Sequence, residues 1–288
     1  QWCGNAPAAY RHALEMEWKK AGTPAPKWGA RRAVLNDLSP AATFMAANYN
    51  QAFDVDEFAK SANRILSTVE RELGWMYETL HSDGKLKGRI DYTVWSEVFS
   101  CPECAAEISF VDEALDNDSK RVRDVFPCPS CGAELNKDRL ERVFESRIDP
   151  ETGQPWQRVK MQPSLISYSI GKKKYEKVPD TFDIATIEKI EQQPLPSEMP
   201  RNRFPIEDMY HGSRIAPKGF THIHHFFLAR AAQSFSEIWR LANSHEDRRV
   251  RSMLLFCFEQ GIRGMSVLNR YKPIQYGKIG GSQVGLDM

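Results

Sequence analysis

The sequence has little that would place it in a membrane or outside the cell. It contains no uninterrupted apolar run of about 18 residues, the length a membrane-spanning helix needs. Residues 1–10 lack the basic start and apolar core of a secretion signal. These two absences predict a cytoplasmic protein with no membrane partner. The sequence also lacks an initial methionine, from which we expect a processed or truncated piece.

An excess of charge of one sign is also missing, because the formal net charge of the 288 residues is only +1. Whole-chain charge therefore neither supports nor excludes nucleic acid as a partner, and only local basic patches are informative. Hydrophobic residues make up 41% and charged residues 27%, as in ordinary globular proteins. The length suits one large domain or one domain with a substantial insertion.

Cysteine is scarce, with six in the sequence, but four of them fall in a pattern. They form two Cys-x-x-Cys pairs, Cys101 with Cys104 and Cys128 with Cys131. Two residues between cysteines let the backbone turn tightly, so that both sulfurs reach one metal ion. Two such pairs complete a closed tetrahedral site. Both segments read Cys-Pro-x-Cys-x-Ala-Glu, which argues against coincidence. The spacing predicts a structural zinc ribbon.

Other interpretations of the cysteine pairs are redox dithiols, two disulfides, or iron in a rubredoxin-like site. The absence of a secretion signal favours metal over disulfides. A closed four-sulfur site has no open coordination position, so we expect a structural and not a catalytic role. Lys120, Arg121 and Arg123, within the ribbon, either contact phosphate or form a solvated strand edge.

Apolar periodicity and helix-start signals predict the local structure. Cys257 lies on the apolar face of the last helix, so we expect a core position for it. Residues 194–219 are proline-rich and predict a surface loop. Helices are expected at 6–21, 40–50, 54–80, 137–145, 180–191, 221–244 and 250–265, and strands at 33–35, 92–99, 108–111, 122–126 and 159–170.

Residues 29–50 carry a resemblance to a known family. A short apolar stretch ends in Asn36 and Asp37, and a helix start follows at Ser39 and Pro40. The segment resembles the second strand and the following helix of DNA amino-methyltransferases. In that family an acidic residue at this strand's tip binds the ribose hydroxyls of S-adenosylmethionine, and the resemblance implies this role for Asp37. The alternative is an ordinary helix cap.

The likeness extends over residues 28–271 and includes the segments that begin at Trp75, Tyr92, Tyr168 and Thr221, as well as the cysteine ribbon. The chain is similar to bacterial site-specific DNA methylases, often adenine-specific, that carry an inserted zinc ribbon. This implies an α/β fold, a partial Rossmann-like S-adenosylmethionine-dependent domain with the ribbon inserted and helices at the C-terminus. We expect a partial cofactor-binding portion at 1–90, the ribbon at 91–145, an extended linker region at 146–220 and a helical region at 221–288.

Two family signatures are missing from the chain. A glycine-rich Phe-x-Gly-x-Gly turn does not precede Asp37, and no Pro-Pro occurs that could belong to the catalytic Asp-Pro-Pro-Tyr motif. We therefore name no catalytic residue and expect this piece alone to be inactive. The resemblance implies methyl transfer to an exocyclic amino group of a flipped base, with adenine N6 favoured and the choice between it and cytosine N4 left open. The alternative is a non-catalytic zinc-ribbon DNA-binding or accessory protein with a degenerate methyltransferase fold.

Double-stranded DNA is the partner that this resemblance implies, with a restriction or accessory subunit as a further partner. The basic turn Lys172, Lys173 and Lys174 either grips phosphate or is a solvated hairpin. His222, His224 and His225 form a second cluster. They lack an accompanying metal motif, so packing or contact with the DNA backbone is favoured over a second metal site.

Overall fold

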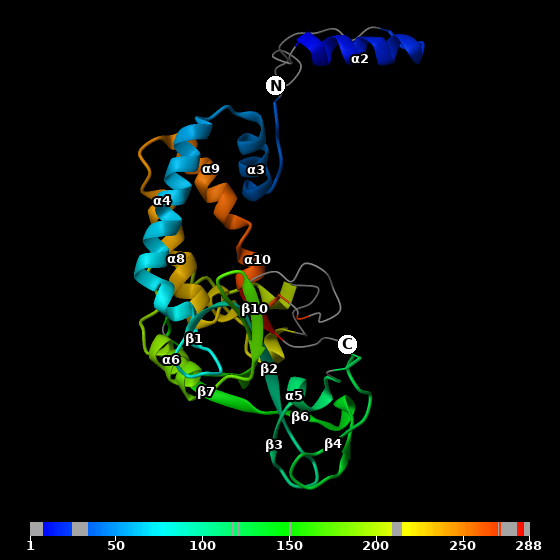
Figure 1. Cartoon of the computed structure of the whole chain (residues 1–288), viewed down its shortest axis with the longest axis vertical. Helices are drawn as coiled ribbons and strands as arrows, with labels where there is room; N and C mark the ends of the chain where they lie inside the picture. The colour runs from blue at the N-terminus through cyan, green and yellow to red at the C-terminus, as the bar shows by residue number, and fades with distance from the viewer. Residues whose placement is uncertain are drawn as a thin grey trace. The chain divides into compact units, whose positions relative to one another are not determined.

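A computed structural model describes residues 8–24, 34–116, 118–119, 121–149, 151–208, 215–269, 271 and 281–284 (Figure 1). The fold is mixed α/β. The chain divides into two compact units, Gln1–Val55 and Asp56–Met288, and each is described by itself. Among the described residues, no helix combines the length and the apolar character that crossing a membrane requires.

The described residues of the first unit include the helices α2 (Ala8–Lys20) and α3 (Pro40–Asn50), as the sequence predicts. The Ser39 hydroxyl caps α3 by accepting a hydrogen bond from the backbone N–H of Ala42. The strand expected at 33–35 is not found at Val34 and Leu35, whose side chains are 98% and 49% exposed. Residue 33 lies outside the described residues. A strand needs a neighbour to pair with, and none of the described strands lies beside this segment.

The second unit is built around one long strand, β2 (Lys87–Ser100). It pairs antiparallel with β1 (Glu78–Leu80) on one side and with β9 (Met161–Ile170) on the other. Beyond β9 lies β10 (Lys173–Lys177), also antiparallel. Residues on both faces of β2 are buried, including the successive residues Val94 and Trp95, so its centre reads as an almost continuous apolar run.

The far end of β2 leads into the cysteine ribbon. Two short strands, β3 (Glu107–Ser109) and β6 (Glu141–Arg142), pair with its last residues. A further strand, β11 (Gly281–Val284), runs parallel to the middle of β2. All other described strand pairs are antiparallel, whereas a Rossmann-like domain has a mainly parallel sheet. The Rossmann-like arrangement is therefore not confirmed by the part of the chain that the structure describes.

Three helices pack together beside the sheet: α4 (Val55–Leu73), α8 (Ala229–Asn243) and α9 (Arg248–Glu259) (Figure 1). Their shared core contains Ile65 of α4 and Leu254 of α9. The helix expected at 54–80 is too long. It ends at Leu73, and a short 3-10 turn, η1 (Gly74–Tyr77), leads into β1. Gly74 at this point explains the end, since glycine is a poor helix former.

The helix α6 (Thr181–Glu191) confirms the prediction for 180–191. Asp180 and Asp183 form a capping box at its start. The buried Asp183 carboxylate also accepts a hydrogen bond from the Thr79 hydroxyl, at 2.6 Å, and lies 2.8 Å from the Lys177 Nζ. These contacts tie α6 to β1 and β10.

Several other sequence predictions differ from the structure, among them the strand expected at 122–126, where Val122 forms only an isolated bridge with Leu115 and a strand begins at Phe126. Residues 137–145 contain a 3-10 turn and strands instead of a helix, because β6 pairs with β2, and β7 (Phe144–Ile148) pairs with β8 (Pro155–Val159). The helix expected at 221–244 is interrupted after the 3-10 turn η5 (Ile223–Phe226), where Phe227 pairs with Ser266. Cys257 is exposed, not in the core. The remaining elements are α5 (Phe110–Ala114), β4 (Phe126–Pro127), β5 (Glu134–Leu135), η2 (Lys137–Arg139), η3 (Ile206–Asp208), η4 (Ala216–Lys218) and α10 (Ile262–Met265).

Candidate metal centre

The structure brings the four cysteines of the sequence motif together. Their sulfur atoms all lie within 4.8 Å of one another. The Sγ of Cys101 is 3.8 Å from that of Cys131, and the Sγ of Cys104 is 3.8 Å from that of Cys128. In a regular tetrahedron with metal–sulfur bonds of about 2.3 Å, sulfurs are separated by about 3.8 Å. The cluster could therefore hold a metal ion such as zinc.

Both cysteine pairs are held by the same backbone turn. In the first, the Cys101 N–H donates to the Ala106 carbonyl at 2.9 Å, and the Ala105 N–H donates to the Cys101 carbonyl at 2.9 Å. The second repeats this at Cys128, with donation to Ala133 at 2.8 Å and from Gly132 at 2.9 Å. The repeated turn follows from the Cys-Pro-x-Cys spacing and aims the two sulfurs of each pair at one point.

Each turn requires one residue in the left-handed region. Gly132 has a φ of 73° and Ala105 a φ of 58°. Glycine adopts this conformation without steric cost, whereas alanine does not. Among the described residues, Ala105 is the only one other than glycine with a positive φ. The first turn is therefore strained at a position where the second is relaxed.

A small apolar core supports the cluster. Cys101 and Cys128 are buried, and Cys104 and Cys131 are exposed. The buried pair packs with aromatic and aliphatic side chains from β2, β3, α5, β4 and β5: Phe99, Ile108, Phe110, Phe126 and Leu135. The ribbon thus has one side closed by apolar packing and one side open to solvent.

The crowded sulfurs perturb one another's ionisation. The backbone N–H groups of Cys131 and Ser130, offset by burial, lower the pKa of Cys128 to about 7. The Ala133 N–H favours the Cys131 thiolate, but the Cys104, Cys128 and Cys101 sulfurs together with burial raise the pKa of Cys131 to about 12. Four sulfurs this close cannot all ionise without a compensating cation, whereas a bound divalent ion deprotonates its thiol ligands.

The basic residues of the ribbon are only partly available to a ligand. Arg123 forms an ion pair with Asp116 at 3.2 Å, and Arg121 is exposed. Lys120 lies outside the described residues. The three lysines of the other basic segment, Lys172, Lys173 and Lys174, are exposed where β9 turns into β10.

Asp37 lies in the first unit, exposed, directly before α3. Its Oδ1 accepts a hydrogen bond from the Ser39 N–H at 2.8 Å. This short-range bond fixes the carboxylate at the helix start. The geometry is compatible both with the helix-cap interpretation and with an oxygen offered to a ligand's hydroxyl groups.

The histidine cluster contains a partner that the sequence did not indicate. The carboxylate of Asp149 lies 3.1 Å from the Nε2 of His224 and 2.6 Å from the Nε2 of His225. Its other oxygen accepts the backbone N–H groups of Glu151 and Thr152. The backbone turn at Asp149 repeats that of the cysteine pairs, with the Asp149 N–H donating to Gln154 and the Gly153 N–H donating to Asp149.

Asp149, His222 and His225 offer ligand atoms close enough for a metal ion, but hydrogen bonds already use two of the groups. The His225 Nδ1 accepts backbone N–H groups from Thr221 and His222, so the Nε2 carries the ring proton that it donates to Asp149. Burial, partly offset by Asp149, lowers the pKa of His225 to about 4. Because both ring nitrogens of His225 are already in hydrogen bonds, the arrangement favours packing over metal binding.

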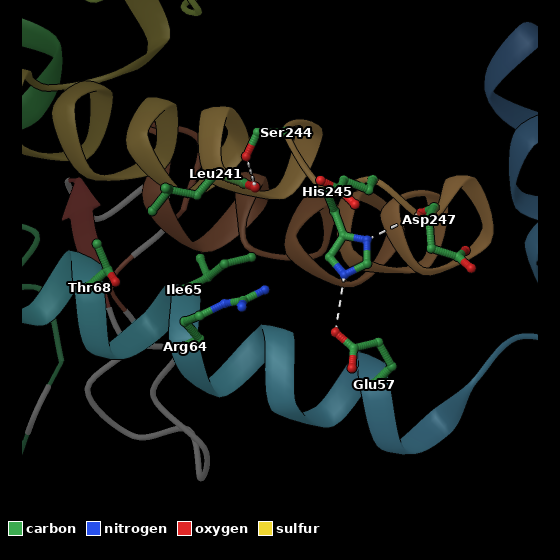
Figure 2. A pocket seen from close by; sticks show the side chains of 9 residues that line it. Glu57, Arg64, Ile65, Thr68, Leu241, Ser244, His245 and Asp247 are labelled. Atoms are coloured by element: carbon green, nitrogen blue, oxygen red, sulfur yellow. Dashed lines mark hydrogen bonds and ion pairs between the residues drawn. The ribbon is translucent and has the colours of Figure 1, made fainter.

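A separate cleft lies between α4 and the turn that joins α8 to α9 (Figure 2). Its volume is about 640 Å³. Two of its lining residues, Glu57 and His245, also contact the buried Ser61: the Ser61 hydroxyl donates to the Glu57 carboxylate at 3.0 Å, and the His245 Nε2 lies 3.1 Å from the Ser61 oxygen. Asp247, also in the lining, caps α9. The cleft is lined by Glu57, Arg64, Ile65, Thr68, Leu241, Ser244, His245, Glu246 and Asp247.

Comparison with known proteins adds no relative: no family model, no curated protein and no solved structure matches this chain. Sequence reasoning found the four cysteines because their spacing is local. It missed Asp149, whose histidine partners lie far along the chain, and no short-range signal would have indicated them.

Proposed function

We propose that this chain is part of an S-adenosylmethionine-dependent DNA methyltransferase and that its four-cysteine cluster binds a structural zinc ion. The observation that carries the metal proposal is the set of sulfur separations, which match a tetrahedral Zn–S₄ site. All four ligands come from the protein, so the ion has no position for substrate. Its role is to hold together a ribbon whose own apolar core is small.

The zinc proposal is tested by measuring the metal content of the purified chain. One zinc ion per chain is expected, and Cys104→Ser or Cys131→Ser should abolish it. Cys257→Ser is the matched control, because Cys257 is an exposed cysteine outside the cluster. If the analysis finds iron in place of zinc, the four cysteines are still a metal site, but the bound ion is iron. Absence of any metal from folded protein would refute the proposal.

The methyltransferase proposal rests on the resemblance over residues 28–271 and on Asp37 at the start of α3. An exposed carboxylate at this position has an oxygen to offer to the ribose hydroxyls of the cofactor. Lys172, Lys173 and Lys174, exposed together at the β9–β10 turn, would contact the phosphates of double-stranded DNA. The methyl acceptor would be an exocyclic amino group, adenine N6 in the first instance. The protein would act in a bacterial cytoplasm, beside a restriction or accessory subunit.

The test is methyl transfer by the complete parent polypeptide. It is incubated with radiolabelled S-adenosylmethionine and mixed genomic DNA, beside an Asp37→Ala variant and an Asp56→Ala control. Asp56 is an exposed carboxylate of α4. Label should enter DNA with the parent and the control and drop sharply with Asp37→Ala. Equal label from all three would keep the enzyme and remove Asp37 from its cofactor site.

The second candidate is a zinc-ribbon DNA-binding or accessory protein without chemistry. It is favoured by the absence of the glycine-rich turn and of Pro-Pro from this sequence. Folded, zinc-loaded parent protein that binds DNA but transfers no label would support this alternative. Such a result would leave the metal site in place and remove the methyltransferase proposal.

A further inference from the structure

Each exposed cysteine of the metal cluster lies next to a buried cysteine of the other turn. Cys104 is exposed, and its Sγ lies 3.8 Å from that of the buried Cys128. Cys131 is exposed, and its Sγ lies 3.8 Å from that of the buried Cys101. A disulfide bond is about 2.05 Å long, so each pair has to close by less than about 2 Å to form one. Two exposed cysteines therefore each have a sulfur partner in place.

Metal binding would keep these sulfurs in the form that oxidants attack. A bound divalent ion holds its sulfur ligands as thiolates, and the thiolate is the species that reacts with a peroxide. Cysteines that respond to oxidants are exposed thiolates with a second cysteine alongside. Cys104 and Cys131 meet both conditions once the cluster is loaded.

We propose that peroxides switch the ribbon from its metal-bound form to one closed by two disulfides, Cys104 with Cys128 and Cys101 with Cys131. The inference rests on the zinc site proposed above. The two bonds would join residues 24 and 30 positions apart, and a disulfide that closes a longer loop restricts the unfolded chain more. Bonds within each turn would leave the two turns unconnected. The disulfides between the turns thus keep the small apolar core of the ribbon closed after the ion has left.

The electrons balance with hydrogen peroxide as the oxidant. The Cys104 thiolate attacks one peroxide oxygen, the O–O bond breaks, and hydroxide leaves while a sulfenic acid forms on Cys104. The Cys128 thiolate then attacks that sulfur, the S–O bond breaks, and a second hydroxide leaves as the disulfide forms. Two thiolates are oxidised, one peroxide is reduced, and both hydroxide ions take up protons to become water. The two remaining sulfurs are too few to hold the ion, and a second peroxide oxidises Cys131 and Cys101 in the same way.

The test oxidises the zinc-loaded chain with hydrogen peroxide, beside a Cys257→Ser variant that lacks the exposed cysteine outside the cluster. A colorimetric indicator follows zinc release, and the remaining thiols are alkylated before digestion with trypsin. Trypsin separates residues 90–120, which carry the first cysteine pair, from residues 124–137, which carry the second. We expect both chains to lose all of their zinc and to give these two peptides linked by disulfides. Fragmentation of the linked peptides should assign Cys104 to Cys128 and Cys101 to Cys131.

Hydrogen exchange distinguishes a switch from irreversible damage. The oxidised chain should keep its protection in residues 101–135, whereas reduced chain stripped of metal by a chelator should lose it. Dithiothreitol with zinc should restore the metal-bound form. Zinc retained in excess peroxide, or disulfides paired in any other way, would overturn the switch and leave the zinc proposal intact. A chain that holds no metal before oxidation would refute the zinc proposal and this inference together.

Discussion

The Sγ atoms of Cys104 and Cys128 lie 3.8 Å apart, although 24 positions separate these residues in the sequence. Each sulfur is placed by its own backbone turn, and the two turns are brought together by β2, β3 and the short strands β4 and β5. The site is therefore an assembly of two local motifs. Its local part and its long-range part can be tested separately.

Replacing one ligand should remove the metal without unfolding the rest of the second unit. For Cys104→Ser we expect zinc affinity to fall by more than about 100-fold. The loss is larger than that caused by removing a residue that only hydrogen-bonds to a metal ligand. Hydrogen exchange should rise in residues 101–135 and stay unchanged in α8 and α9, whose shared core is separate. Equal loss of protection in both regions would contradict a local structural role.

Substitutions at the left-handed residues of the two cysteine turns, Ala105 and Gly132, should change the free energy of unfolding in opposite directions. Ala105→Gly should stabilise the protein by about 0.5–1 kcal/mol, because relief of the left-handed alanine outweighs the greater freedom of glycine when unfolded. Gly132→Ala should destabilise it by about 1 kcal/mol. A Cβ at Gly132 would meet no atom within 4 Å, so only the backbone contributes to this cost. Urea unfolding measures both changes, and two changes of the same sign would refute the backbone argument.

Asp149 should be a stabilising residue and not a metal ligand. Asp149→Ala would leave the N–H groups of His225, Glu151 and Thr152 without their acceptor, so we expect a loss of about 3 kcal/mol or more in the free energy of unfolding. Asp138→Ala, at an exposed carboxylate, is the control for urea unfolding. A second metal ion per chain that disappears in Asp149→Ala would instead establish a metal site.

The lowered pKa of Glu145 predicts that the folded protein loses stability as the pH falls. Burial raises the pKa of Glu145, but Arg158 and Arg147 more than offset this, so the pKa stays below its usual range. Because the folded pKa is lowered, the stabilisation is complete above the unfolded value of about 4.3 and is lost as pH falls towards the folded value. Tm measured from about pH 6 to pH 3 should fall less steeply in Glu145→Gln than in the wild-type protein. Identical profiles would show that the ion pair does not contribute.

The features that the sequence predicted correctly are those with short-range causes. The cysteine turns follow from two-residue spacing, and the starts of α3 and α6 follow from Ser39 and Asp180, which act on residues two or three positions away. Helix α4 was predicted with its apolar face, although its end at Gly74 was not.

The features that the sequence did not reveal depend on distant partners. Residues 137–145 form strands because β2 and β8 lie alongside them, which periodicity within the segment cannot indicate. Asp149 meets its histidines 75 and 76 positions later. The roles of Asp37 and of the lysines at 172–174 remain predictions, since they concern molecules that bind from outside.

The path of β2 has a mechanical consequence. This strand pairs with five others among the described strands, and its last residue, Ser100, is bonded directly to the first cysteine of the cluster. A force applied to the ribbon is therefore transmitted along the backbone of the strand that organises the whole sheet. Metal binding should therefore restrain the C-terminal end of β2, so that the metal content of the ribbon also affects the stiffness of the sheet.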